Sequence, residues 1–179
     1  MHLFDVRLKF ARDLIGHWLD LRLGQRVPLE ADLDPRALLR CLDHIAFIDL
    51  TQASKLTIEQ PGLVMRRRFG CDIRYMNWGE LVPATLGDPG QRARERIRRI
   101  PCAFYHKFTV ALDGADTVTA ETLLLPLRRR NAVLPHVVIG MTRDIGKDGA
   151  GTPSGWLTPS ADVVQYFMEL VDISDVGCG

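Results

Sequence analysis

The feature that constrains the fold most is a pair of apolar, β-branched runs within residues 117–141, separated by the basic segment 128–131. β-branched residues on both sides of a polar break are typical of two antiparallel strands joined by a turn. Pro126 and Pro135 cannot donate a hydrogen bond to a neighbouring strand, so each should lie at a strand end, a bulge or an unpaired edge position. The sequence therefore predicts a long β-hairpin around which the rest of the chain is arranged.

A third strand is predicted over residues 102–112, immediately before this hairpin. Its even-numbered positions are apolar except for His106, whereas its odd-numbered positions are small, polar or aromatic. This period of two gives the strand one apolar face. Asp113 and Gly114 supply a tight turn into the hairpin, so the three strands should form an antiparallel meander.

Two further strands are predicted in the first half of the chain. Residues 44–50 form a short apolar run suited to a buried strand, residues 51–62 read as a polar loop, and residues 63–69 read as the next strand. Glycine and proline divide residues 70–100 into short helices or turns, with no long element before a helix at 91–100. The predicted strand order is therefore two strands, then three.

Amphipathic segments flank this core. The apolar stripe of residues 3–23 predicts a helix that packs either on its own domain or in a dimer interface. Asp34 and Pro35 should open a short helix, as N-cap and first helical residue. Apolar spacing after Thr158 predicts a last amphipathic helix. The predicted divisions are an N-terminal helical segment (1–43), a core (44–145), a flexible linker (146–157) and a C-terminal helix and tail (158–179).

Four stretches carry further motifs: HWLDLRLGQRVPLEADLDPRALLRCLDHIAFIDL at 17–50, RRRFGCDI at 66–73, Pro101 before the third strand, and ETLLLPL at 121–127. In this order and spacing, they resemble a bacterial family of stand-alone PAS-like proteins. The resemblance implies an α+β fold, with a five-stranded antiparallel sheet, helices on one face and an enclosed apolar cavity. Domains of this kind commonly sense small molecules or carry contacts between proteins, although a fold alone does not fix a function.

Charge and composition argue against several classes of function. With 23 Lys and Arg against 22 Asp and Glu, the net charge of +1 gives no reason to expect a nucleic acid or an anionic membrane as partner. No run approaches the roughly 18 apolar residues needed to span a bilayer. The cysteines lie far apart in the sequence, which predicts reduced thiols in a cytoplasmic protein and no metal site. They are Cys41, Cys71, Cys102 and Cys178.

The resemblance and the apolar pattern together predict a ligand pocket with one polar residue, His106. Its lining is predicted to be Phe47, Met65, Trp78, Phe104, His106, Phe108 and Leu124. Such a pocket suits a small apolar or amphipathic ligand, for which His106 would supply polar specificity. The same histidine could instead be hydrogen-bonded within a filled core. Haem ligation by His106 is supported only by the position of this residue, so haem is not favoured. The sequence identifies no other cofactor.

Catalysis finds little support in the sequence. No nucleophile elbow, phosphate-binding loop, zinc-protease motif or dinucleotide fingerprint occurs. Cys102 and His106 share a face of the third strand, but at ~3.3 Å per residue they would lie ~13 Å apart, too far for a nucleophile and its base. The leading hypothesis is therefore a non-enzymatic sensory or regulatory domain that binds a small ligand and signals to a protein partner in trans.

Two alternatives stay open. A ligand-free adaptor would work only through its surface and its end helices, with the first helix able to make a homodimer. An anion or nucleic-acid binder would use Arg92, Arg96 and Arg99, joined by the arginines of 66–68 and 128–130. Because the apolar residues of the 91–100 helix share its other face, these arginines are better explained as a solvated surface.

Overall fold

The predicted meander forms the centre of a computed structural model that describes residues 9–22, 27–52, 55–100, 102–112, 116–130, 137–145 and 154–172. Its strands β3 (Cys102–Ala111), β4 (Thr117–Leu127) and β5 (Val137–Ile145) are consecutive and antiparallel, which confirms the prediction. Pro126 lies one residue before the end of β4, where its missing N–H is tolerated. Pro135, Asp113 and Gly114 lie outside the described residues.

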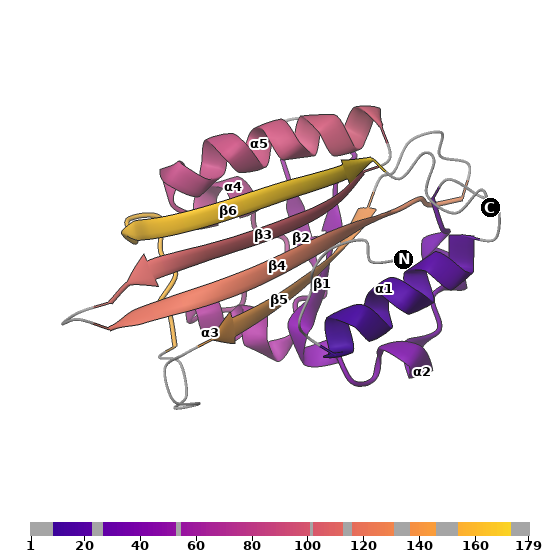
Figure 1. Cartoon of the computed structure of the whole chain (residues 1–179), viewed down its shortest axis with the longest axis horizontal. Helices are drawn as coiled ribbons and strands as arrows, with labels where there is room; N and C mark the ends of the chain where they lie inside the picture. Colours follow the sequence, from indigo (N-terminus) through magenta and orange to yellow (C-terminus); the bar gives the residue numbers. More distant parts are fainter. Residues whose placement is uncertain are drawn as a thin grey trace.

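One six-stranded antiparallel sheet runs through the molecule (Figure 1). β1 (Ile45–Asp49) pairs with β5 on one side and with β2 (Thr57–Glu59) on the other. β6 (Val163–Asp172) pairs with β3, so the strand order is β2-β1-β5-β4-β3-β6. Five of these strands follow the predicted order of two strands and then three. The sixth strand was not predicted.

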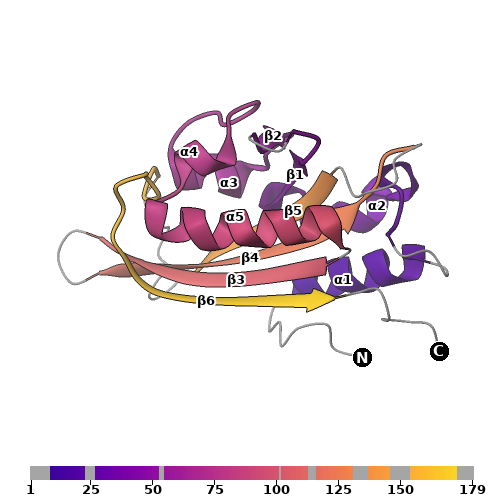
Figure 2. The same ribbon diagram turned by 90° about the horizontal axis from the view of Figure 1, so that it is seen from above.

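Helices α3 (Leu63–Phe69), α4 (Trp78–Leu81) and α5 (Ala84–Arg99) cover one face of the sheet (Figure 2). Apolar side chains of α5, among them Ala93 and Ile97, pack against Phe104 of β3. Along β3, residues such as Phe104 that face α5 alternate with residues that point to the other face of the sheet, as the period of two requires. The cavity described below lies between this layer and the sheet.

The opposite face of the sheet is covered by α1 (Lys9–Arg22), the predicted amphipathic N-terminal helix. Its stripe packs on its own domain: Leu14 and Trp18 are buried in the same cluster as Leu125 of β4. The Trp18 indole Nε1 also donates a 2.9 Å hydrogen bond to the carbonyl oxygen of Pro126. Dimerisation through this helix stays a prediction.

The segment between α1 and the sheet contains three short helical turns. They are η1 (Glu30–Asp32), α2 (Pro35–Leu38) and η2 (Leu42–His44). α2 begins as the sequence predicts, because Asp34 Oδ1 accepts a 2.8 Å hydrogen bond from the backbone N–H of Arg36. None of the helices in the described part of the chain combines the length and the apolar character that crossing a membrane requires.

The prediction of a strand over 63–69 is wrong, because this segment is the helix α3. Met65 and Arg68 are its buried residues, and their spacing of three is helical. Gly70 ends the helix in the left-handed conformation at φ 72°, with its N–H bonded to the Arg67 carbonyl. The second strand is instead β2, within the segment that reads as a loop.

The predicted C-terminal helix is also wrong, because β6 occupies this part of the chain. β6 pairs with β3 from Cys102↔Asp172 to Val110↔Val163. Apolar residues at helical spacing suggested a helix, but the segment is rich in valine and aromatic residues that favour strands. Without β6, the ten residues of β3 would form an unpaired sheet edge. Pairing with β3 therefore determines that residues 163–172 form a strand.

The long helix of the second half begins earlier than predicted. α5 starts at Ala84 and continues through Gly87, Pro89 and Gly90 to Arg99. Glycine and proline were taken as breaks, yet packing of its apolar residues against the sheet outweighs their low helix propensity. Of the predicted linker, residues 146–153 lie outside the described part of the chain.

Candidate ligand-binding site

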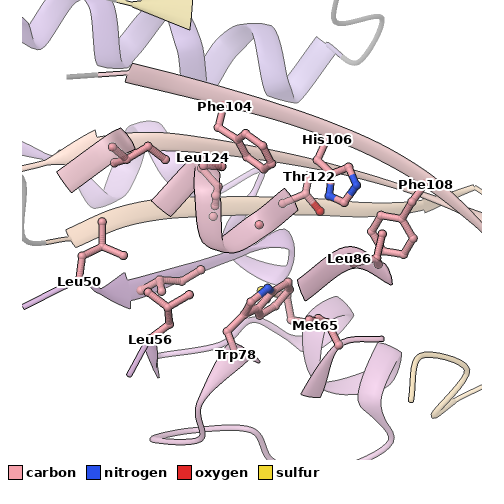
Figure 3. A pocket seen from close by; sticks show the side chains of 16 residues that line it. Leu50, Leu56, Met65, Trp78, Leu86, Phe104, His106, Phe108, Thr122 and Leu124 are labelled. Carbon is pink, nitrogen blue, oxygen red and sulfur yellow. The ribbon is translucent and has the colours of Figure 1, made fainter. Parts of the chain in front are cut away.

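A cavity of about 50 Å³ lies between the sheet and the helices α3, α4 and α5 (Figure 3). Its sheet side is formed by apolar residues of β1, β3 and β4 and by a glycine of β5, with one histidine and one threonine among them. The lining residues on this side and just beyond β1 are Ile48, Leu50, Phe104, His106, Phe108, Thr122, Leu124 and Gly140.

The helix side of the cavity is apolar throughout apart from one indole N–H. It is formed by Leu56, Met65, Trp78, Val82, Leu86, Gly90, Ala93 and Ile97. A concave, mostly apolar lining with a few polar groups is the usual form of a site for a small molecule.

The structure brings six of the seven residues predicted for the pocket to this cavity. They are Met65, Trp78, Phe104, His106, Phe108 and Leu124. Phe47 does not line it and packs with the cluster under α1. Because neighbouring residues of a strand point to opposite faces, Ile48 lines the cavity in its place.

His106 lies between two aromatic rings on the inner face of β3. Its ring centroid is 5.7 Å from that of Phe104 and 5.0 Å from that of Phe108. Burial, and to a smaller extent the positive charge of Arg68, lowers the pKa of His106 to about 4. The imidazole is therefore neutral at physiological pH, and offers one N–H donor and one nitrogen acceptor.

Thr122 is the polar lining residue that sequence reasoning missed. It is the direct cross-strand neighbour of His106, and only 5% of it is exposed. Its Oγ1 is buried and makes no hydrogen bond within the part of the chain that the structure describes. One signal could have found it: Val118, Ala120 and Leu124 share its face of β4, so a threonine stands in an otherwise apolar row.

Arg68 of α3 lies behind the cavity and is fully buried. Its guanidinium carbon is 6.0 Å from the Phe108 ring centroid and 5.5 Å from that of Trp156, at cation–π distance from both rings. Phe108 and Trp156 also contact one another, with ring centroids 6.2 Å apart. Phe108, which lines the cavity, is thus linked to Trp156 in the segment that leads into β6.

The arginines considered for anion binding do not all face solvent. Arg92, Arg96 and Arg99 are exposed on α5, as a solvated face requires. Arg129 makes ion pairs with Glu30 at 2.8 Å, Glu59 at 2.6 Å and Asp49 at 3.7 Å. With Arg129 held by these carboxylates and Arg68 buried, neither contributes to a free basic surface.

Cysteines and acidic residues form no metal site in the described ranges, where no three His, Cys, Asp or Glu side chains gather as ligands would. Cys41 and Cys102 are buried thiols and Cys71 is exposed, while Cys178 lies outside the described residues. Burial, with the charge of Asp13, raises the pKa of the Cys41 thiol, so this cysteine is poorly suited to act as a nucleophile.

A family model described as a PAS domain matches residues 7–141 of the 179. The match runs from α1 into β5 and leaves β6 outside it. Searches among curated proteins and among solved structures found no match.

Proposed function

The chain belongs to the PAS domain family, whose members are sensory and regulatory domains, and from this we propose that it binds a small ligand in the cavity between α5 and the sheet. The observation that carries the proposal is a buried, mostly apolar cavity with two neighbouring polar side chains, His106 and Thr122, on one wall. Ligand binding then shifts the protein between two conformations, and a protein partner in trans recognises one of them.

The chemistry of the lining supports a role without catalysis. A histidine with a pKa of about 4 is a weak base at neutral pH, so His106 would activate the neighbouring Thr122 hydroxyl poorly. The remaining lining side chains are hydrocarbons, a thioether and an indole, which neither exchange protons nor attack a substrate. Binding followed by a change of shape is the activity that such a site favours.

A chain of contacts supports β6 as the element that reports ligand binding. The carbonyl oxygen of Arg67 accepts hydrogen bonds from Gly155 N at 2.7 Å and Ser154 Oγ at 3.3 Å, and that of Arg68 accepts one from Leu157 N at 3.0 Å. These bonds fix the end of α3 to the segment that precedes β6. A ligand that displaces Phe108 would therefore act on this segment through Arg68 and Trp156.

A partner could read β6 directly, because it is an edge strand of the sheet. Val164 is 50% exposed and Phe167 is 54% exposed, although both are large apolar side chains. Exposed apolar side chains on an edge strand are suited to contacts with another chain.

A ligand-free adaptor is the second candidate function, and the cavity volume favours it. About 50 Å³ is small for a ligand site, since such pockets commonly measure ~300–1,000 Å³. In an adaptor, the side chains would only fill the core, and signalling would use the exposed surface alone. The two functions differ in whether the cavity admits a small molecule.

Xenon binding to the full chain distinguishes them, because xenon enters apolar cavities without needing a polar contact. Under xenon pressure, methyl NMR signals of Leu86, Ile97 and Leu124 should shift in a saturable way. The signals of Leu125 and Leu127, which lie on the other face of the sheet, should not. Absence of saturable shifts at the cavity would contradict ligand binding and favour the adaptor.

Two variants of α5 control this experiment. Ala93→Leu places three more carbons at a lining position that is 1% exposed, and should abolish the xenon shifts. Ala84→Leu makes the same substitution at an exposed position of the same helix and should preserve them. Circular dichroism should establish that both variants are folded, since overpacking a core costs about 1–3 kcal/mol.

A further inference from the structure

The two polar side chains of the sheet side, His106 and Thr122, lie together on one wall, and the helix side adds only the indole N–H of Trp78. Thr122 and His106 are directly opposed on β4 and β3, so their Cβ atoms are about 5 Å apart. In Figure 3 both lie on one side of the cavity, while Leu50 and Leu56 lie on the other. The site therefore has a polar end and an apolar end.

The Thr122 hydroxyl is the observation that points to a ligand. Thr122 is more than nine-tenths buried, lines the cavity, and its Oγ1 has no hydrogen-bond partner among the described residues. A buried hydroxyl without a partner is costly, because it has lost its bonds to water. Valine has nearly the same shape and would avoid that cost, so the threonine calls for an explanation.

We infer that the cavity takes a neutral molecule of a few non-hydrogen atoms whose single hydrogen-bonding group faces Thr122 and whose apolar part lies toward Leu50 and Leu56. The inference rests on the proposed function, because it names the ligand class for the same cavity. Small alcohols, aldehydes and amides belong to this class.

The cavity volume limits the size of the ligand. A cavity of ~150 Å³ holds benzene, with its six carbons, so about 50 Å³ corresponds to roughly two or three non-hydrogen atoms. So small a ligand binds weakly, with a dissociation constant no tighter than roughly 0.5 mM. The site would therefore respond to a compound that reaches millimolar concentrations.

The lining also selects against charge. Apart from His106, Thr122 and the indole of Trp78, the walls offer a charged group nothing in place of its lost hydration. A cation would in addition be repelled by the buried guanidinium of Arg68, whose charge acts on His106 from behind the wall. Arg68 itself does not line the cavity, so it does not supply the direct contact that a bound anion needs.

Four probes of three non-hydrogen atoms each test the ligand class: propane, ethanol, ethylammonium and formate. Methyl NMR titration of the full chain should give saturable shifts at Leu124 and Leu86 with propane and with ethanol. Ethylammonium and formate should bind at least tenfold more weakly than ethanol. Formate or ethylammonium binding as tightly as ethanol would overturn the inference that the ligand is neutral.

Variants at Thr122 test the polar contact. Thr122→Val should raise the ratio of the ethanol and propane dissociation constants about tenfold, the effect of one hydrogen bond, and Thr122→Ser should restore it. A ratio that is unchanged in Thr122→Val overturns the inference, while propane and xenon binding would leave the proposed function intact. If neither propane nor xenon binds, the proposed function fails as well.

Stability supplies a second readout that needs no ligand. Because Thr122→Val removes a buried hydroxyl without a partner, its urea midpoint should be higher than that of the wild type. A lower midpoint would contradict the statement that this hydroxyl is unsatisfied within the protein, and with it the inference. Thr122→Ser, which keeps the hydroxyl, should show no such rise.

Discussion

At the residue scale, His106 shows how the cavity wall sets the properties of a single side chain. Two phenylalanine rings flank the imidazole, and Arg68 lies nearby. Both burial and the neighbouring positive charge disfavour the protonated form, so they act on the pKa in the same direction. The wall therefore holds a polar but uncharged group, which a neutral ligand can contact without displacing an ion pair.

The lowered pKa of His106 predicts a pH dependence of stability. In the unfolded chain the imidazole takes up a proton near pH 6.5, whereas in the folded protein it does so only near pH 4. Between these two pH values the unfolded state therefore binds more protons than the folded state. The contribution of the neutral His106 to the free energy of unfolding is complete above pH 6.5 and is lost as the pH falls toward 4. The loss should amount to about 3 kcal/mol.

Urea denaturation of wild type and His106→Gln at several pH values measures this contribution. Glutamine does not titrate, so the variant should lose about 3 kcal/mol less than the wild type between pH 7 and pH 4. The comparison concerns the slope with pH and not the absolute stability, which the substitution also changes. Parallel pH profiles for the two proteins would show that His106 keeps its ordinary pKa in the fold.

At this scale, strand alternation correctly predicted most residues of the cavity wall, but the sequence did not show which polar side chains are buried there. Alternation along 102–112 put Phe104, His106 and Phe108 on one face, which is how they lie. Phe47 was assigned without regard to its neighbour Ile48, whose side chain takes the inner face. Thr122 was missed because the alternation of 117–127 was not followed residue by residue, and its significance as a buried hydroxyl without a hydrogen bond appears only in the structure.

At the scale of the elements, the end of α3 is fixed by two glycines in contact. Gly70 has φ 72°, and a Cβ built on it would lie 3.0 Å from the Cα of Gly155. Gly70→Ala should therefore lower the free energy of unfolding by about 2 kcal/mol, from left-handed strain and from the backbone contact. The substitution acts where α3 is joined to the segment before β6.

Gly87→Ala is the matched control for this change. Gly87 lies inside α5, and nothing lies within 4 Å of a Cβ built on it. Alanine should therefore raise stability there by about 0.5–1 kcal/mol, through helix propensity. Thermal unfolding of both variants gives the comparison. Equal effects at the two sites would show that the contact between α3 and Gly155 is not tight.

The order of the elements along the chain was largely predictable, but two of them, α3 and β6, were assigned the wrong type of secondary structure. The meander could be found from β-branched runs and alternation, which report local preferences. α3 was read as a strand because Leu63, Met65 and Phe69 alternate along it, and that alternation does not anticipate that Arg68 is buried near Phe108 and Trp156. β6 was read as a helix because its pairing partner, β3, is more than 50 residues away, and local spacing does not report such a contact.

At the scale of the whole molecule, β6 extends the fold beyond the part that matches the family. The match ends at residue 141, while β6 covers the full length of β3 on the other side of the core strands. β3 thus carries cavity residues in its side chains and binds β6 through its backbone. Any ligand that changes the position of Phe104 or Phe108 acts on a strand to which β6 is directly bonded.

The central claim is that the cavity admits a small molecule and that β6 responds. Amide hydrogen exchange of the full chain under xenon tests it most directly, in the wild type and in Ala93→Leu. At xenon concentrations ten times the dissociation constant, ligand linkage predicts up to about tenfold slower exchange in β6 and α5 of the wild type. The filled variant should show no change. Unchanged exchange in wild-type β6, or equal slowing in Ala93→Leu, would contradict the account.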